Sequence, residues 1–270
     1  MKTDLCFSEK NKDGVVWMEA ENLRFPHGFT TRFGGVSSGI YASLNLGEHR
    51  GDDDLCVAEN YRRLCAALDF PVERLVFSRQ VHRADIRYVT PEDCHELFAP
   101  VPYEADGLIT DTPNLPLVIF TADCIPILLS DPVRGAIGAL HAGWRGTVAD
   151  IAGAGVRAMV SKFGCRPEDI QAAIGPGISY CCFETGREVP EAILSLLGDS
   201  GRGFFTSKGE KYMVDLKAVN RRLLENAGVL PAHIAVSPEC TMCSHDKYWS
   251  HRYTKGQRGS QASLIMIKEA

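Results

Sequence analysis

Three apolar runs of strand length follow one another closely in the middle of this 270-residue chain. They span residues 115–120, 125–129 and 136–140. Thr-Ala-Asp-Cys separates the first two, and the turn Asp131-Pro-Val-Arg-Gly135 lies between the last two. Nearly continuous apolar strands are typical of a sheet that is buried on both faces. A chain with such a sheet at its centre needs further layers of structure to cover it.

Helical patterns on both sides of these strands supply such layers. Residues 52–68 repeat apolar side chains at helical spacing behind an acidic start. Residues 147–163, with Thr147 as the cap and Gly164 as the stop, predict a second helix. Further helices are expected at 190–197 and 216–227, and shorter β-type runs occur at 75–77, 86–89, 170–174, 234–236 and 264–267. The mixture predicts an α/β fold, an α+β sandwich with helices packed on a mixed β-sheet. No linker or repeat divides the chain, so residues 1–270 are expected to form a single domain.

Charge and hydropathy exclude several classes of protein. The net charge is -5, and no block of Lys and Arg marks a nucleic-acid partner or an anionic membrane. No apolar run reaches the ~18 residues of a membrane span. The start, Met1-Lys-Thr-Asp-Leu-Cys6, lacks the apolar core of a signal peptide, so a cytoplasmic location is expected. The ten cysteines are scattered, and most are expected to be free, small buried hydrophobes.

Three soft metal ligands stand at the ends of β-type segments, namely His82, Cys124 and His141. Asp123 and Pro126 are poor residues for the interior of a central strand, which places Cys124 at a strand end. Three protein ligands leave a fourth zinc position for water or substrate, the arrangement of catalytic sites. The ordinary alternatives are a hydrogen-bonded structural His and a core Cys. Cys124 and His141 also suit the nucleophile–base pair of a cysteine hydrolase, which would leave His82 without a role.

Two segments offer groups for an anion and a sugar. In His141-Ala-Gly-Trp-Arg-Gly146, Arg145 precedes the helix start expected at Thr147, whose unpaired N–H groups favour an anion such as phosphate. Upstream, Arg32 lies beside a glycine loop, and Asn45 belongs to a run of small polar residues suited to a sugar. Ordinary turn chemistry is the alternative for both.

Other polar clusters give weaker signals. Cys240-Thr-Met-Cys243 has the spacing of a zinc ligand pair but no second such pair in the chain, and Cys181 and Cys182 are adjacent, so no disulfide between them is expected. Asp106 and Glu184 are candidate carboxylates near the site, with surface roles as the default. The sequence leaves the roles of Asp106, Asp123, Glu184 and Arg83 open.

Several motifs together resemble the YfiH/YlmD laccase-domain family, over nearly the whole chain. The segment His141-Ala-Gly-Trp-Arg-Gly-Thr147 matches best. The others are His27-Gly-Phe-Thr-Thr-Arg-Phe-Gly-Gly-Val-Ser37, Ser43-Leu-Asn-Leu-Gly47, Gln80-Val-His82, Ala105-Asp-Gly107, Thr121-Ala-Asp-Cys124, Ile174-Gly-Pro-Gly-Ile178, Cys182-Phe-Glu-Thr-Gly186 and Cys240-Thr. Arg83 departs from the pattern, because the family usually has Gly after Gln-Val-His.

The resemblance implies a single α/β domain with one catalytic metal, zinc or alternatively copper, on His82, Cys124 and His141. It also implies a purine nucleoside phosphorylase that uses phosphate to cleave adenosine, inosine and S-methyl-5'-thioadenosine, with adenosine deaminase activity. Eight histidines are few for the several coppers of a laccase, which favours one metal centre.

Other functions stay open. A copper polyphenol oxidase, a cysteine hydrolase in peptidoglycan precursor editing, and a zinc-stabilised interaction protein without catalysis remain as alternatives. The oligomeric state is also open, with a homodimer as one option.

Overall fold

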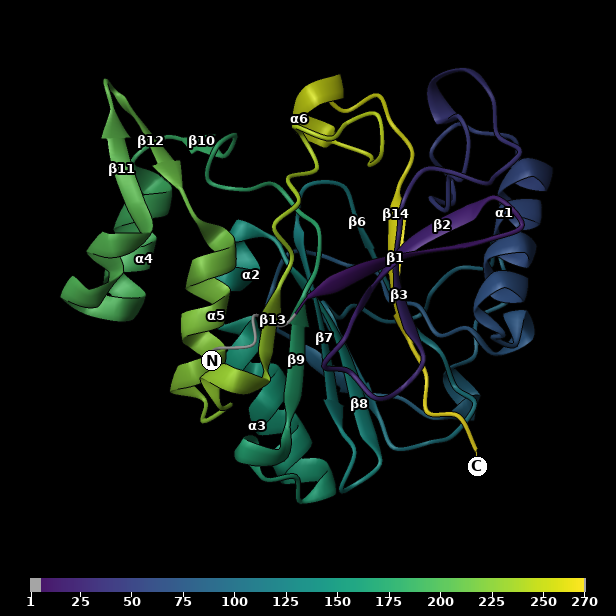
Figure 1. The fold of residues 1–270 in the computed structure, drawn as a ribbon, viewed down its shortest axis with the longest axis horizontal. Coiled ribbons are helices and arrows are strands. Elements are labelled where there is room, and N and C mark those ends of the chain that lie inside the picture. Colours follow the sequence, from purple (N-terminus) through teal and green to yellow (C-terminus); the bar gives the residue numbers. More distant parts are fainter. Residues whose placement is uncertain (1–5, 270) are drawn as a thin grey trace.

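The computed structural model describes residues 6–269. The strands β1 to β14 of this part of the chain form three sheets (Figure 1). The largest, mixed sheet has the order β13 (Ile234–Val236), β9 (Gln171–Ile174), β7 (Ile125–Asp131), β8 (Ala136–Ala142), β5 (Gly107–Thr110) and β4 (Ile86–Tyr88). An antiparallel sheet has the order β1 (Phe7–Lys12), β2 (Val15–Ala20), β3 (His27–Thr30), β14 (Gln261–Ile265) and β6 (Leu117–Thr121). The smallest has the order β10 (Glu184–Thr185), β12 (Lys211–Val214) and β11 (Phe205–Lys208).

The central strands β7 and β8 are buried along their whole length, as the apolar runs predicted. Side chains alternate between the faces of a strand, so each of these strands serves two cores. Ile127 and Leu140 belong to a core shared with helices, whereas Leu128 and Ile137 belong to a core shared with Ile119 of the five-stranded sheet. The two larger sheets therefore pack face to face.

Helices cover the outer faces of both larger sheets (Figure 1). The helices α3 (Ile151–Phe163) and α5 (Leu216–Asn226) pack on the mixed sheet, and α1 (Asp54–Leu68) packs on the five-stranded sheet. The helix α4 (Glu188–Leu197) lies with the smallest sheet at one side of the molecule. Two short helices, α2 (Trp144–Val148) and α6 (His251–Thr254), complete this set.

The predicted α/β fold is confirmed, with corrections in its parts. The chain forms two packed sheets and a small third one, where one mixed sheet was expected. The helix predicted at 147–163 is two helices, and Thr147 is not its cap. Gly143 is the N-cap of the first helix. Asp150 adopts φ 62°, which separates the two helices, and its side chain caps the second by accepting a hydrogen bond from the Gly153 N–H. Residues 75–77 contribute only an isolated bridge at Val76.

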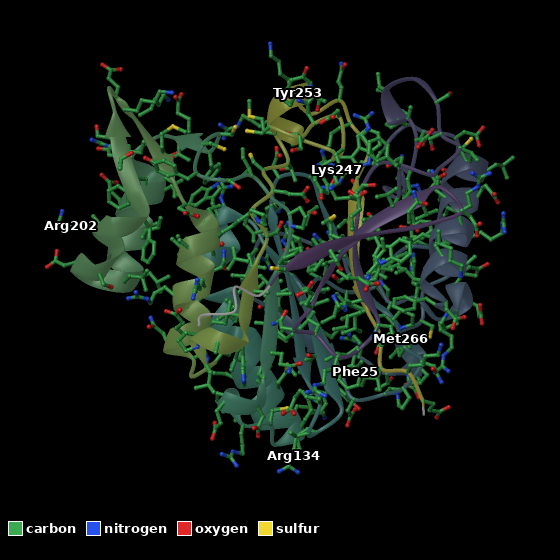
Figure 2. All side chains as sticks on the ribbon, viewed as in Figure 1. Phe25, Arg134, Arg202, Lys247, Tyr253 and Met266 are labelled. Atoms are coloured by element: carbon green, nitrogen blue, oxygen red, sulfur yellow. The ribbon has the colours of Figure 1, made fainter. Side chains whose placement is uncertain are left out.

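The hairpin of β7 and β8 sets the position of the site. Its turn contains Arg134, at one end of the molecule in Figure 2. Cys124 and His141 lie at the opposite end of these strands, the end at which Tyr253 of α6 is seen. Within residues 6–269, no helix combines the length and apolar character needed to cross a membrane.

Candidate metal centre

The structure brings together the three predicted metal ligands. Cys124 immediately precedes β7, His141 lies near the end of the neighbouring β8, and His82 comes from the loop before β4. One ligand atom from each lies within 4.8 Å of the others, and the Cys124 Sγ is 3.9 Å from the His82 Nε2. The pairing of β7 with β8 thus brings Cys124 and His141 together, and the loop before β4 adds His82.

Asp106 holds two of these ligands in place. This fully buried carboxylate accepts the Nδ1–H of His141 at 2.8 Å. It also accepts three successive backbone N–H groups, from Val81, His82 and Arg83, at 2.8–3.1 Å. These bonds secure the loop in which His82 adopts the left-handed region at φ 62°. Asp106 is therefore the residue that positions the site, a role that the sequence left open.

Asp106 also sets the tautomer of His141. An ionised carboxylate only accepts hydrogen bonds, so the Nδ1 of His141 keeps its proton, and Nε2 is the nitrogen that can bind a metal once its own proton has left. Burial raises the pKa of Asp106, but hydrogen bonds from His141 and from the backbone of Arg83 outweigh it and lower that pKa. The carboxylate is thus charged at neutral pH.

Asp123 orients Cys124 from the preceding position. Its backbone has φ 86°, a conformation that costs a non-glycine residue roughly 1–3 kcal/mol unless the surroundings enforce it. The Thr241 hydroxyl and the Arg252 N–H both donate to its carboxylate at 2.7 Å. The Asp123 carbonyl accepts the Ile178 N–H at 2.8 Å. Asp123 therefore has a structural role in aiming the Cys124 thiol.

The metal-free triad favours a thiolate. Burial raises the pKa of Cys124, but the charge and hydrogen bond of His141 and the proximity of His82 outweigh it and lower that pKa to about 6. Burial lowers the pKa of His141, yet Cys124 and Asp106 raise it to about 9. A thiolate is the form of cysteine that binds metals and attacks electrophiles.

The ligand set fits a zinc or copper ion. Two ligand atoms bound to one zinc at about 2.0–2.3 Å lie about 3.3–3.8 Å apart in a tetrahedron. The ligand atoms of the triad lie within 4.8 Å of one another, and the Cys124 Sγ and the His82 Nε2 are 3.9 Å apart, slightly wider than in a filled site. Thiolate and imidazole are the ligands that zinc and copper prefer.

Gly143 leaves the room that this site needs. A Cβ at this position would lie 2.8 Å from the His82 Cδ2 and 3.2 Å from the Cys124 Sγ. The glycine of the His-Ala-Gly-Trp-Arg-Gly motif is thus required by the close approach of the backbone to two ligands.

Two adjoining cavities meet at the triad. One of about 380 Å³ has His82, Cys124 and His141 in its wall, together with the aromatic rings of Phe77 and Phe120. The other, of about 370 Å³, shares His82 and Cys124 and extends to a set of larger side chains, namely Trp144, Ile178, Phe183, Leu216, His251 and Arg252. The combined space has more apolar than polar wall and includes several polar and charged side chains, as small-molecule sites do.

Two arginines that the sequence analysis did not select, Arg50 and Arg258, line both cavities. Arg258 donates through Nη1 to the Gly259 carbonyl and the Ser260 hydroxyl, but its buried Nε has no hydrogen-bond partner among the described residues. Burial and the charge of Arg50 lower the pKa of Arg258 to about 10, so it stays cationic at neutral pH. A buried donor beside a second cation favours an anionic ligand. Arg258 lies in the loop Gly256-Gln-Arg-Gly259, which was the available sequence signal.

The residues predicted to bind phosphate and sugar, Arg32, Asn45 and Arg145, are not in the walls of these two cavities. Arg32 donates to the carbonyls of Ala42 and His245 and stacks on Trp249, so its guanidinium is occupied. Asn45 is fully buried and bridges Asp52 to the Gly47 and Ser260 N–H groups. Arg145 is exposed over the Trp144 ring, outside the walls of both cavities. Because α2 begins at Trp144, no helix start lies at Thr147 to complete an anion site there.

Two other polar residues left open by the sequence form ion pairs away from the triad. The Arg83 guanidinium pairs with Glu104, and the Glu184 carboxylate pairs with Lys208, each at 3.1 Å. These pairs join exposed or half-buried groups, and such pairs contribute little to stability.

Comparison with known proteins identifies the family. Residues 26–268 match the family described as multi-copper polyphenol oxidoreductase laccase. The chain is 40% identical to the purine nucleoside phosphorylase YlmD of Geobacillus stearothermophilus over 90% of each chain, and 42% identical to a purine nucleoside phosphorylase of Deinococcus radiodurans over 93% of each.

Solved structures show the same fold. The crystal structure of YlmD from Geobacillus stearothermophilus matches with a TM-score of 0.93 at 38% identity, over 98% of this chain and 100% of that one. The Bacillus licheniformis YfiH structure matches with a TM-score of 0.90 at 35% identity, over 96% and 99%. The chain belongs to the multi-copper polyphenol oxidoreductase laccase family, and the expected kinship with YfiH and YlmD proteins is confirmed.

Proposed function

We propose that this protein is a metal-dependent purine nucleoside phosphorylase. Its substrates in this proposal are phosphate with adenosine, inosine or S-methyl-5'-thioadenosine. The names of the relatives from Geobacillus stearothermophilus and Deinococcus radiodurans support the reaction class. The observation that carries the proposal is the convergence of His82, Cys124 and His141 on the same cavity wall as Arg258.

The cavity provides separate environments for the parts of such a substrate pair. Phe77, Phe120 and Val101 form apolar walls suited to a flat purine. Arg50 and Arg258 face the same space and supply the positive charge that phosphate requires. In this proposal these two arginines replace Arg32 and Arg145 as the phosphate ligands, and no sugar contact is assigned to Asn45.

Phosphorolysis requires an oxygen of phosphate to bond to C1' of the ribose while the bond from C1' to the purine breaks. The electron pair of that bond leaves with the base, which then takes up a proton. Arg258 and Arg50 hold the phosphate and orient it towards C1', which removes much of the entropic cost of the encounter. The apolar walls exclude water, which would otherwise compete with phosphate for C1'.

The triad supplies the electrophilic side of the site. A zinc ion held by His82, Cys124 and His141 would supply a Lewis acid that stabilises developing negative charge. Asp106 keeps His141 in the ligating tautomer, and Asp123 keeps Cys124 aimed at the cavity. The same site is proposed to deaminate adenosine, a reaction in which water replaces the amino group at C6 and ammonia leaves.

A cysteine hydrolase is the second candidate, because the metal-free Cys124 is a thiolate beside His141. A metal chelator would leave such an activity intact, and thiol alkylation would abolish it. For a copper polyphenol oxidase, the chain offers few histidines, and the described residues contain one His-bearing ligand cluster. Metal analysis of protein purified without added copper, together with a phenol oxidation assay, tests that alternative.

The test compares Cys124→Ala with Cys56→Ala, a half-buried cysteine on α1. With inosine and phosphate, the Cys56→Ala protein should release hypoxanthine at the wild-type rate. The Cys124→Ala protein should lose metal from this centre and lose phosphorolysis and deamination together. Full phosphorolysis by Cys124→Ala protein would overturn the proposal.

A further inference from the structure

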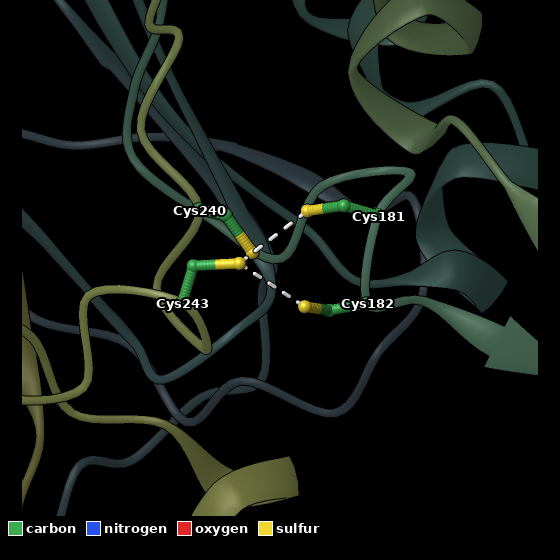
Figure 3. A group of neighbouring side chains, drawn as sticks. All are labelled: Cys181, Cys182, Cys240 and Cys243. Carbon is green, nitrogen blue, oxygen red and sulfur yellow. Dashed lines mark hydrogen bonds between the residues drawn. The ribbon is translucent and has the colours of Figure 1, made fainter.

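Four cysteines from two separate loops converge outside the site described above (Figure 3). Cys181 and Cys182 lie between β9 and β10, and Cys240 and Cys243 follow β13. Their four sulfur atoms all lie within 4.8 Å of one another. The Cys243 Sγ is 3.3 Å from that of Cys182 and 3.5 Å from that of Cys181.

The backbone brings these loops together in a defined way. The strands β9 and β13 are parallel neighbours, so both loops leave the same end of the sheet. The pairing continues beyond the strands, because Gly177 and Cys240 form a parallel bridge and the Thr241 N–H donates to the Gly177 carbonyl at 3.2 Å. The cluster is therefore built on the sheet and not on two free loops.

The surroundings of the cluster suit a negatively charged metal thiolate centre. The Ser179 N–H donates to the Cys240 Sγ at 3.4 Å. Lys217, only 4% exposed, donates to the carbonyls of Ser237 and Glu239 just before Cys240. A complex of one divalent ion with four thiolates has a net charge of two minus, and a buried cation nearby offsets part of this charge.

A disulfide explains less of this arrangement. The shorter of these two sulfur separations, 3.3 Å, is well above the ~2.05 Å of a disulfide, and all four thiols are free. Cys243 approaches two different sulfurs, and all four sulfurs lie within 4.8 Å of one another, a grouping around one centre that pairwise disulfides do not require. Four ligands about 2.3 Å from one zinc lie about 3.8 Å apart in a tetrahedron. The two separations to the Cys243 Sγ, 3.3 and 3.5 Å, are close to that value, and no pair of these sulfurs is more than 4.8 Å apart.

We propose that Cys181, Cys182, Cys240 and Cys243 bind a second metal ion, a structural zinc ion with four thiolate ligands. All four coordination positions belong to the protein, so this ion would not take part in catalysis. It would instead hold the two loops together. This inference does not depend on the proposed nucleoside chemistry.

The structure also indicates how this ion would affect the first site. Thr241 lies between two of the proposed ligands, and its hydroxyl donates to Asp123, which orients Cys124. Loss of the structural ion should therefore loosen Thr241 and reduce activity without removing any ligand of the His82, Cys124 and His141 centre.

The test is metal analysis of protein purified under reducing conditions without added metal. The wild type and the Cys56→Ser control should hold about two zinc ions per chain. The double variant Cys181→Ser/Cys243→Ser should hold about one, and so should Cys124→Ala/His141→Ala, which leaves the four-cysteine cluster intact. The Cys181→Ser/Cys243→Ser protein should also melt at a lower temperature.

A second measurement covers a variant that fails to fold. Wild-type protein stripped of metal and titrated with Co²⁺ should develop the intense visible absorption and thiolate-to-cobalt charge transfer of a tetrahedral four-sulfur site. Two results would overturn the proposal. One is wild-type protein that holds a single ion per chain and whose Cys181, Cys182, Cys240 and Cys243 all react with a thiol reagent before any chelator is added. The other is mass spectrometry showing a disulfide within the cluster in anaerobically purified protein.

Discussion

Replacing Asp106 by Asn keeps the shape of the side chain but exchanges one carboxylate oxygen for an NH₂ group. Each carboxylate oxygen of Asp106 accepts two hydrogen bonds, Oδ1 from the His82 N–H and His141 Nδ1, and Oδ2 from the Val81 and Arg83 N–H groups. An Asn amide has one accepting oxygen and one donating NH₂ group. Whichever way it turns, the NH₂ group faces two donors.

The expected magnitude follows from those two lost bonds. A buried donor left without a partner costs about 1–3 kcal/mol, so Asp106→Asn should lower the free energy of unfolding by about 2–6 kcal/mol. His141 also loses the carboxylate that sets its tautomer. Changes of this kind at a ligand's hydrogen-bond partner weaken metal binding by about 10–100-fold.

Two assays separate these effects. Urea denaturation of the metal-free proteins gives the stability, and competition with a chromophoric chelator, on protein shown to be folded, gives the zinc affinity. Asp85→Asn, which removes the same charge from an exposed position on the same loop, is the control. An Asp106→Asn protein that matches that control in stability and binds zinc within twofold of the wild type would refute the role of Asp106.

Three further predictions follow from the geometry. Gly143→Ala should weaken zinc binding by at least about tenfold, because the added Cβ meets His82 and Cys124. The control Gly203→Ala should keep the wild-type affinity, because a Cβ there meets nothing within 4 Å. Equal zinc affinities of the two variants in the chelator competition would contradict the close approach at Gly143. In metal-free protein, alkylation of Cys124 should rise through a midpoint near pH 6 and level off at neutral pH, measured by mass spectrometry. The proton leaves the thiol above its lowered pKa, and His141→Ala should move this midpoint upward; a rate still rising steeply towards pH 9 would exclude the thiolate. Arg258→Met should raise the Km for phosphate by about 10–100-fold, since a hydrogen bond to a charged group contributes about 1.5–3 kcal/mol. Arg145→Met should keep the wild-type Km for phosphate. A raised Km in Arg145→Met and an unchanged Km in Arg258→Met would instead restore the sequence-based assignment of phosphate to Arg145.

The central sheet was predictable because its signal is local. The strands β7 and β8 are buried on both faces, so their apolar runs are continuous and easy to recognise. The face-to-face packing of two sheets was not predictable, because β14 near the end of the chain pairs with both β3 and β6. Such long-range pairing leaves no local pattern.

The helix starts show a finer limit. Thr147 and Asp150 are both residues that commonly cap helices, and only the structure distinguishes them. Asp150 adopts φ 62° and its side chain accepts the Gly153 N–H, whereas Thr147 lies inside α2.

The candidate metal ligands could be selected by residue type, but the residues that position them could not. His and Cys at strand ends suggest a metal whatever surrounds them. Asp106 and Arg258 acquire their roles only when the fold brings their side chains to the triad, and both sit in sequence contexts that equally suit a surface turn. Cys181 and Cys182 likewise supply the second ligand pair that Cys240-Thr-Met-Cys243 lacked in the sequence, without its C-x-x-C spacing.

The most direct test of the proposed function uses wild-type protein of known metal content. It is incubated with inosine in the presence and absence of phosphate, and hypoxanthine and ribose 1-phosphate are both quantified. The account predicts that hypoxanthine appears only with phosphate, in equal amount to ribose 1-phosphate, and that a chelator which removes the catalytic metal stops the reaction. Hypoxanthine release without phosphate, or an undiminished rate in metal-free protein, would contradict it.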